Sequence, residues 1–107
     1  MPTCWQERSA KTVVNKLIER NWTISFAESC TGGLAAARLV SVPDASKVFA
    51  ASVVTYANEA KVKYVDVDPE IIKRFGVVSD EVALSMAKGV AKANEAQVGV
   101  GISGIAG

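Results

Sequence analysis

The chain has 107 residues, with 12 Lys and Arg, 11 Asp and Glu, and no histidine, which excludes Ser-His-Asp and Cys-His triads and histidine metal sites within it. Half of its residues are apolar and 21% are charged, a composition typical of a globular chain, and we expect residues 1–107 to form one domain. The formal net charge of +1 offers no field that would attract nucleic acid or a membrane, so we expect neither as a partner.

The two cysteines, Cys4 and Cys30, are too few for a metal quartet or a disulfide framework and too far apart for a CxxC motif. Free thiols of this kind are typical of a reducing cytosol. Residues 1–8 lack the apolar region of a signal peptide, and no segment approaches the ~18 apolar residues of a membrane span. We therefore expect a cytoplasmic protein that uses no metal or other cofactor.

Hydrophobic periodicity, propensity and capping signals predict helices and strands in alternation. In chain order they are a helix over Ser9–Arg20, a strand over Thr23–Ala27, a helix over Leu34–Val40, a strand over Val48–Tyr56, helices over Asn58–Tyr64 and Pro69–Phe75, a helix over Asp80–Asn94 with Ser79 as N-cap, and a strand over Gln97–Ile102.

Apolar residues at helical spacing give two of these helices a core face. The predicted core residues are Val13, Val14, Leu17 and Ile18 in the first helix, and Ala83, Met86, Ala87, Val90 and Ala91 in the last. The nearly uncharged second strand is expected to be buried on both faces, and the glycine-containing third strand is also expected to be buried.

This alternation predicts a layered α/β/α sandwich, with helices on both faces of a largely parallel sheet. Three strands make a small sheet, and the last strand runs into the glycine-rich loop Ser103–Gly107. We expect the fold to be continued by residues beyond Gly107, or to be completed by a neighbouring subunit in a homo-oligomer.

The turn Glu28–Gly33 (ESCTGG) joins the first strand to a helix, at the sheet edge where α/β proteins bind ligands. Hydroxyls and a thiol at Ser29, Cys30 and Thr31, beside two glycines at the start of a helix, are compatible with an oxyanion or phosphate site that contains a nucleophile. The alternative is that Ser29 or Thr31 only caps the helix, while the glycines only allow a tight turn.

The loop Ser103–Gly107 follows the third strand, so it lies at the same edge if all strands are parallel. Two glycine-containing turns side by side would form a pocket. The alternative is a plain connecting loop.

The segment Thr55–Lys61 (TYANEAK) begins where the second strand ends, and Asn58 and Lys61 share a helical face. Without histidine, a serine nucleophile needs another base, and a desolvated lysine such as Lys61 can lose its proton near neutral pH. The alternatives are that Lys61 is a solvated surface residue and that Tyr56 is a core aromatic with its hydroxyl at the rim.

Two further features are weaker candidates. Cys30, expected at the N-terminus of a helix, could itself be the nucleophile, although no base lies near it in the sequence. Asp66, Asp68 and Glu70 suggest a metal-binding run, but the glycine of an EF-hand is missing and Pro69 breaks the spacing, so an exposed turn is expected.

Four blocks of sequence, in this order and at this spacing, resemble the CinA C-terminal domain family of competence- and damage-inducible proteins. They are Ala27–Gly33 (AESCTGG), Val53–Lys61 (VVTYANEAK), Gly76–Met86 (GVVSDEVALSM) and Gly101–Gly107 (GISGIAG). The resemblance covers nearly the whole chain, and four blocks in register are far more specific than any one of them.

The resemblance implies an amidohydrolase, nicotinamide mononucleotide deamidase, which converts the carboxamide of the nucleotide into a carboxylate and releases ammonia in pyridine nucleotide recycling. By this resemblance Ser29 is the nucleophile, Lys61 its base and Tyr56 a neighbouring active-site hydroxyl. We expect peptide N–H groups of the first turn to stabilise the oxyanion. The expected substrate-binding residues are Cys30, Thr31, Gly32, Gly33, Asn58, Ser103 and Gly104.

The chain departs from the family pattern at a few positions. Ser103 stands where threonine is usual, Asp44 where glycine follows Pro43, and Ala51-Ser52 where a glycine-containing stretch is usual. Family members also continue past this last loop, with segments that include an arginine implicated in substrate binding. The alternative function is therefore a non-catalytic module for nucleotide binding or assembly that retains the family site.

Overall fold

The structure, a computed structural model, describes residues 4–105. Its elements in chain order are α1 (Cys4–Arg20), β1 (Ile24–Glu28), α2 (Leu34–Val40), the 3-10 turn η1 (Ala45–Lys47), β2 (Phe49–Val54), α3 (Asn58–Val65), α4 (Pro69–Phe75), α5 (Asp80–Ala93) and β3 (Val98–Ile102). Every predicted helix and strand is present. The largest difference is at the first helix, which begins at Cys4 rather than at Ser9.

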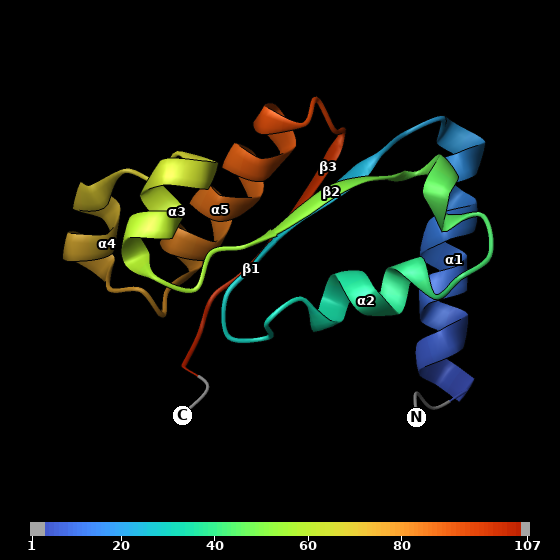
Figure 1. The fold of residues 1–107 in the computed structure, drawn as a ribbon, viewed down its shortest axis with the longest axis horizontal. Helices are drawn as coiled ribbons and strands as arrows, with labels where there is room; N and C mark the ends of the chain where they lie inside the picture. The colour runs from blue at the N-terminus through green and yellow to red at the C-terminus, as the bar shows by residue number, and fades with distance from the viewer. Residues whose placement is uncertain (1–3, 106–107) are drawn as a thin grey trace.

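The strands form a parallel sheet in the order β2-β1-β3. Figure 1 shows α1 and α2 to one side of the strands, and α3, α4 and α5 to the other. The predicted α/β architecture with helices on both faces is therefore confirmed. Because the strands run in one direction, their carboxyl ends meet at one edge of the sheet.

The central strand β1 is buried along its whole length and contributes to two separate cores. Ile24 and Phe26 pack against buried residues of α1, α2 and η1. Ala27 points to the opposite face, where the second core contains Val65, Val67, Val82, Met86 and Val90. Successive strand residues point to opposite faces, so one five-residue strand anchors both helical layers.

The two outer strands are less buried than predicted. In β2, Ala50 and Val54 are exposed, so the expectation of burial on both faces is wrong, and β3 is half-buried throughout. The reason is the strand order. Within the described residues each of these strands pairs only with β1, and the helices do not fully cover a strand at the edge of so small a sheet.

The core face of α1 is narrower than its apolar pattern predicts. Val14 and Leu17 are buried, whereas Val13 and Ile18 are exposed. Only the innermost stripe of the helix is buried where it rests on the sheet and on α2, whereas Val13 lines an open hollow beside apolar residues such as Phe26.

The predicted apolar stripe of α5 packs directly against the glycines of β3. A Cβ atom added to Gly99 would lie 2.1 Å from the carbonyl oxygen of Ala87, and one added to Gly101 would lie 2.1 Å from that of Ala83. Glycine therefore lets the helix backbone touch the strand backbone. The helix starts as predicted, because the Ser79 hydroxyl accepts a hydrogen bond from the Val82 amide at 3.2 Å.

Some expectations concern atoms outside the described part of the chain, namely the thiol of Cys4 and residues 106–107 of the last loop. The thiol of Cys30 is free, as expected. Among residues 4–105, no helix combines the length and the apolar character that a membrane span requires.

We predict that Gly101→Ala lowers the free energy of unfolding by about 3 kcal/mol, because the new methyl group would collide with the backbone of α5. Urea denaturation followed by circular dichroism would measure it. The control is Val100→Ala on the opposite face of β3, where a half-buried side chain is shortened at a cost of about 1 kcal/mol. Equal stability of Gly101→Ala and the parent chain would contradict the close contact between α5 and β3.

Candidate active site

Ser29 and Lys61 are far apart in the sequence and adjacent in the structure. Ser29 directly follows β1, and Lys61 lies on α3, which begins shortly after the end of β2. The Lys61 Nζ lies 3.2 Å from the Ser29 Oγ. Ser29 is 3% exposed and Lys61 is fully buried, so the pair predicted from the sequence meets in a site shielded from water.

Two backbone carbonyl oxygens hold the amine of Lys61. Nζ donates to the oxygen of Thr55 at 2.8 Å and to that of Tyr56 at 2.9 Å, both at the carboxyl end of β2. No described carboxylate forms an ion pair with Lys61. The alternative that Lys61 is a solvated surface lysine is therefore wrong.

Burial lowers the pKa of Lys61 from its ordinary value of 10.5, because the protonated amine loses its hydration, while the nearby Cys30 opposes this effect in part. A lysine that loses its proton more readily can act as a general base. The site therefore has a hydroxyl and a basic amine in hydrogen-bond contact.

Glu28 occupies the position that the sequence suggested for an anionic ligand. The residue is fully buried, and its carboxylate accepts the amide N–H groups of Ala35 at 3.0 Å and Ala36 at 2.9 Å, and the hydroxyl of Thr31. These amides belong to the first turn of α2. The predicted phosphate or oxyanion contact with the first-turn amides of α2 is therefore wrong, because a carboxylate of the chain itself takes these donors. An oxyanion contact with the amides of Cys30 and Thr31 stays a prediction.

Neither Ser29 nor Thr31 caps α2, whose N-cap residue is Gly33. Sequence reasoning missed Glu28 as the residue that satisfies the start of this helix. A signal for it was present, because Ile24, Phe26 and Glu28 alternate along the strand and so share the face on which α2 packs.

The two glycine-containing turns lie side by side, as expected. Gly32 and Gly33 have φ angles of +61° and +104°, a region that glycine adopts readily, and they allow the chain to reverse before α2. A Cβ atom added to Gly104 would lie 3.0 Å from the Sγ of Cys30. The loop after β3 therefore touches the loop after β1 beside Ser29.

The side chains of three other predicted site residues make no hydrogen bond with Ser29 or Lys61 in the described part of the chain. Tyr56 meets Lys61 through its carbonyl oxygen, and its side chain is 63% exposed. Ser103 donates its hydroxyl to the carbonyl of Val77, which ties the end of β3 to the segment before α5. Asn58 is exposed and lines a separate groove of about 410 Å³ between α3 and α4, although Lys61 on the same helix is buried. Direct substrate contacts by these three side chains stay predictions.

Cys30 is half-buried next to Ser29, but it is not at a helix N-terminus as expected, because α2 begins only at Leu34. The acidic run forms an exposed turn, as predicted, in which Asp66 ends α3 and Asp68 caps α4. In the described part of the chain, no group of three or more Cys, Asp or Glu side chains is arranged to hold a metal ion.

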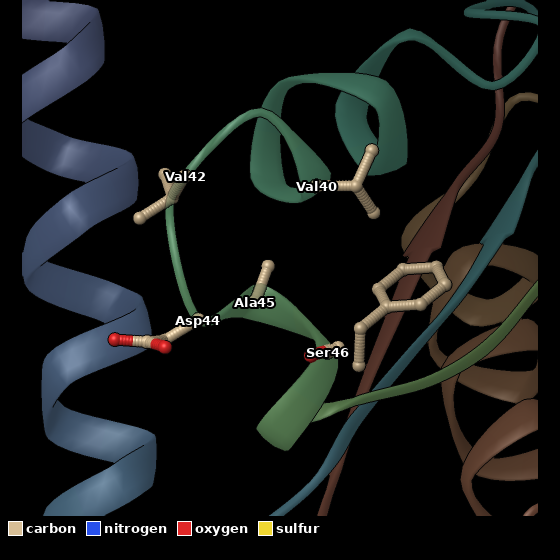
Figure 2. A pocket seen from close by; sticks show the side chains of 6 residues that line it. Val40, Val42, Asp44, Ala45 and Ser46 are labelled. Atoms are coloured by element: carbon tan, nitrogen blue, oxygen red, sulfur yellow. The ribbon is translucent and has the colours of Figure 1, made fainter.

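A hollow of about 460 Å³ lies away from this pair, at the amino end of β2 (Figure 2). Its lining comes from the end of α2, the η1 turn and the first residue of β2, and comprises Val40, Val42, Asp44, Ala45, Ser46 and Phe49. Ser29 and Lys61 lie at the other end of the strands, so this hollow is separate from the candidate site.

Comparison with known proteins gives consistent matches. The sequence profile of the CinA C-terminal domain family matches residues 6–107. A CinA-like protein from Dictyoglomus turgidum is 53% identical over 97 residues, which are 91% of this chain and 24% of that protein. A CinA-like protein from Kosmotoga olearia is 48% identical over 102 residues, 95% of this chain and 25% of that protein. The chain thus spans about a quarter of the length of these curated relatives.

Solved structures agree with this result. The competence/damage inducible protein CihA from Agrobacterium tumefaciens superposes with a TM-score of 0.85 at 34% identity, over 90% of this chain and 58% of that one. A CinA superfamily protein from Escherichia coli gives 0.83 at 31% identity, over 90% and 57%. From the sequence match over nearly its whole length and this shared fold, the chain belongs to the CinA C-terminal domain family.

Proposed function

We propose that this chain carries the serine-lysine site of an amidohydrolase that deamidates nicotinamide mononucleotide to nicotinate mononucleotide and ammonia. The observation that carries the proposal is the buried amine of Lys61, which pairs with no carboxylate of the described residues and lies 3.2 Å from the Ser29 Oγ. The substrate comes from the family resemblance of the motifs ESCTGG and TYANEAK. The chain spans only part of the length of its relatives, so the deamidase activity is proposed for the whole protein to which these residues contribute the serine-lysine site.

The contacts of Lys61 suit a base that works in its neutral form. Protonated lysine has three N–H donors, which match the oxygens of Thr55, Tyr56 and Ser29. After losing a proton, the amine keeps two N–H groups for the two carbonyls. Its lone pair is then left for the hydroxyl proton of Ser29.

The reaction would proceed in two stages. Lys61 takes the proton of Ser29 as the Oγ attacks the amide carbon, and the ammonium then gives this proton to the amide nitrogen, which leaves as ammonia. Water next attacks the acyl-serine ester while Lys61 takes one of its protons and passes it to the Ser29 Oγ, which releases the nicotinate product and the free hydroxyl. Lys61 is neutral again after each stage, so no further acid or base is required.

The turn after Ser29 supports stabilisation of the oxyanion. Gly32 donates its amide to the Ser29 carbonyl, and Leu34 donates to Thr31, whereas the amides of Cys30 and Thr31 make no backbone hydrogen bond within residues 4–105. An amide directly after the nucleophile is a common oxyanion donor in serine hydrolases. We assign this role to the N–H groups of Cys30 and Thr31.

We predict that Ser29→Ala and Lys61→Met each lower kcat/KM for ammonia release from nicotinamide mononucleotide by at least about a thousandfold. The first change removes the nucleophile, and the second removes the base that activates it. The measurement is coupled detection of ammonia, with circular dichroism to confirm folding.

Lys63→Met is the matched control, since Lys63 lies two residues away on α3 and is exposed. It should keep the activity of the parent chain. Full activity in Ser29→Ala would overturn the mechanism, and a complete loss in Cys30→Ala with little change in Ser29→Ala would move the nucleophile to Cys30. Calorimetric binding of the nucleotide without turnover by the parent chain would favour a binding module instead.

The pH dependence of kcat/KM should report Lys61. Only the neutral amine is a base, so the rate rises with pH as Lys61 loses its proton and then levels off. Because burial lowers the pKa of this amine, the midpoint of the rise should lie below the ordinary lysine value of 10.5. A midpoint at or above that value would contradict a desolvated base.

The pH dependence of the free energy of unfolding tests the lowered pKa of Lys61 without any measurement of catalysis. Folding disfavours protonated Lys61, so between its lowered pKa and 10.5 the folded chain binds fewer protons than the unfolded chain. The Lys61 contribution to the free energy of unfolding therefore increases as pH rises through this window. Lys61→Met should lack this increase, measured by urea denaturation at neutral pH and about pH 10 with Lys63→Met as the control. Parallel pH profiles for the parent chain and Lys61→Met would contradict the lowered pKa.

A further inference from the structure

Glu28 is a buried acidic residue that the proposed reaction does not use. It is fully buried, it directly precedes Ser29, and no described cation forms an ion pair with it. A buried carboxylate without a cation is costly unless hydrogen bonds replace its lost hydration. Its position next to the proposed nucleophile therefore calls for an explanation.

The carboxylate of Glu28 ties together both ends of the turn that carries Ser29. One oxygen accepts the Thr31 hydroxyl and the Ala35 amide, and the other accepts the Ala36 amide. Burial alone would raise the pKa of Glu28, but these hydrogen bonds, with a further one from the Gly33 amide, hold it below 4.5. The group is therefore ionised at neutral pH and acts only as an acceptor.

Fixing Glu28 also orients Ser29. Adjacent residues at the end of a strand point to opposite faces of the sheet, and Glu28 faces α2 while Ser29 faces Lys61 on α3. If the Glu28 side chain were released from α2, the turn would lose the contacts that fix its direction. The Ser29 hydroxyl would then no longer be held against the amine.

We propose that Glu28 is a positioning residue, whose carboxylate fixes the turn 29–33 through Thr31 and the first turn of α2 and so keeps the Ser29 Oγ against the Lys61 Nζ. This inference rests on the proposed function, in which Ser29 is the nucleophile. Glu28 forms no hydrogen bond or ion pair with Lys61, so it would act on the reaction only through the position of Ser29. The Thr31 hydroxyl, expected from the sequence to bind substrate, is thereby reassigned as a part of the same support.

The kinetic test compares Glu28→Gln, Thr31→Val and the double variant with the parent chain. A misplaced nucleophile slows the chemical step and leaves binding unchanged, so each single variant should lower kcat by about 10-fold to 100-fold with KM within about twofold. Thr31→Val should have little additional effect in the Glu28→Gln background, because both changes break the same support. Thr31→Ser, which keeps the hydroxyl, should restore the parent kcat.

Ser25→Ala is the matched control for removing a buried polar group from β1. Ser25 is fully buried on the same strand, and its hydroxyl has no partner in the described part of the chain. This variant should keep the parent kcat and KM. Each rate is expressed per folded molecule, from denaturation curves, so that a loss of folded protein is not counted as a loss of positioning.

A second readout needs no deamidation. A fluorophosphonate probe would react with the Ser29 Oγ, forming an O–P bond and releasing fluoride while Lys61 takes the hydroxyl proton, and mass spectrometry would give the rate. We expect labelling of Ser29 in the parent chain and at least about tenfold slower labelling in Glu28→Gln.

The outcomes separate the two proposals. Slower labelling in Glu28→Gln, in a parent chain that releases no ammonia, would support the positioning role and overturn the proposed substrate. Unchanged kcat and labelling rate in Glu28→Gln, or a raised KM with unchanged kcat, would overturn the positioning role alone. A parent chain whose Ser29 does not label would overturn both.

Discussion

The alternation of side chains along β1 governs both the fold and the candidate site. Ile24 and Phe26 face the core under α1 and α2, whereas Ala27 faces the core under α3 and α5. The same alternation continues past the apolar residues, so Glu28 meets α2 and Ser29 meets Lys61. The hydrophobic packing that sets the register of the strand therefore also directs the two polar residues at its end.

Burial disfavours the charged form of both Glu28 and Lys61, but their hydrogen-bond partners make the outcomes differ. Lys61 has carbonyl and hydroxyl oxygens around it but no described carboxylate, so removal from water favours its neutral form and lowers its pKa. Glu28 has enough hydrogen-bond donors to replace its hydration, so its pKa falls and it stays charged. The number and type of partners, and not burial alone, therefore decide which group gives up its charge more readily and which stays ionised.

Much of the fold was predictable because its signals are local. Periodicity and caps located every α-helix and strand of the described residues, including the Ser79 cap of α5, and the alternation of elements predicted a parallel sheet. The short η1 turn was not predicted. The errors concern the start of α1 and the burial of several residues. The exposure of Val13 and of Val54 depends on strand order and on how far the helices extend over the sheet, and a local sequence pattern contains neither.

The sequence by itself determined that any hydrolytic base supplied by these 107 residues must be something other than histidine, and its motifs selected Ser29 and Lys61. Only the tertiary structure decided that these two side chains meet, that Lys61 is buried, and that Glu28 takes the helix amides expected to bind an anion. The physical reason is that pKa values and hydrogen-bond partners depend on neighbours from other elements. Thr55 and Tyr56 at the end of β2, and the first turn of α2, become neighbours of the site only when the parallel sheet brings its strand ends together.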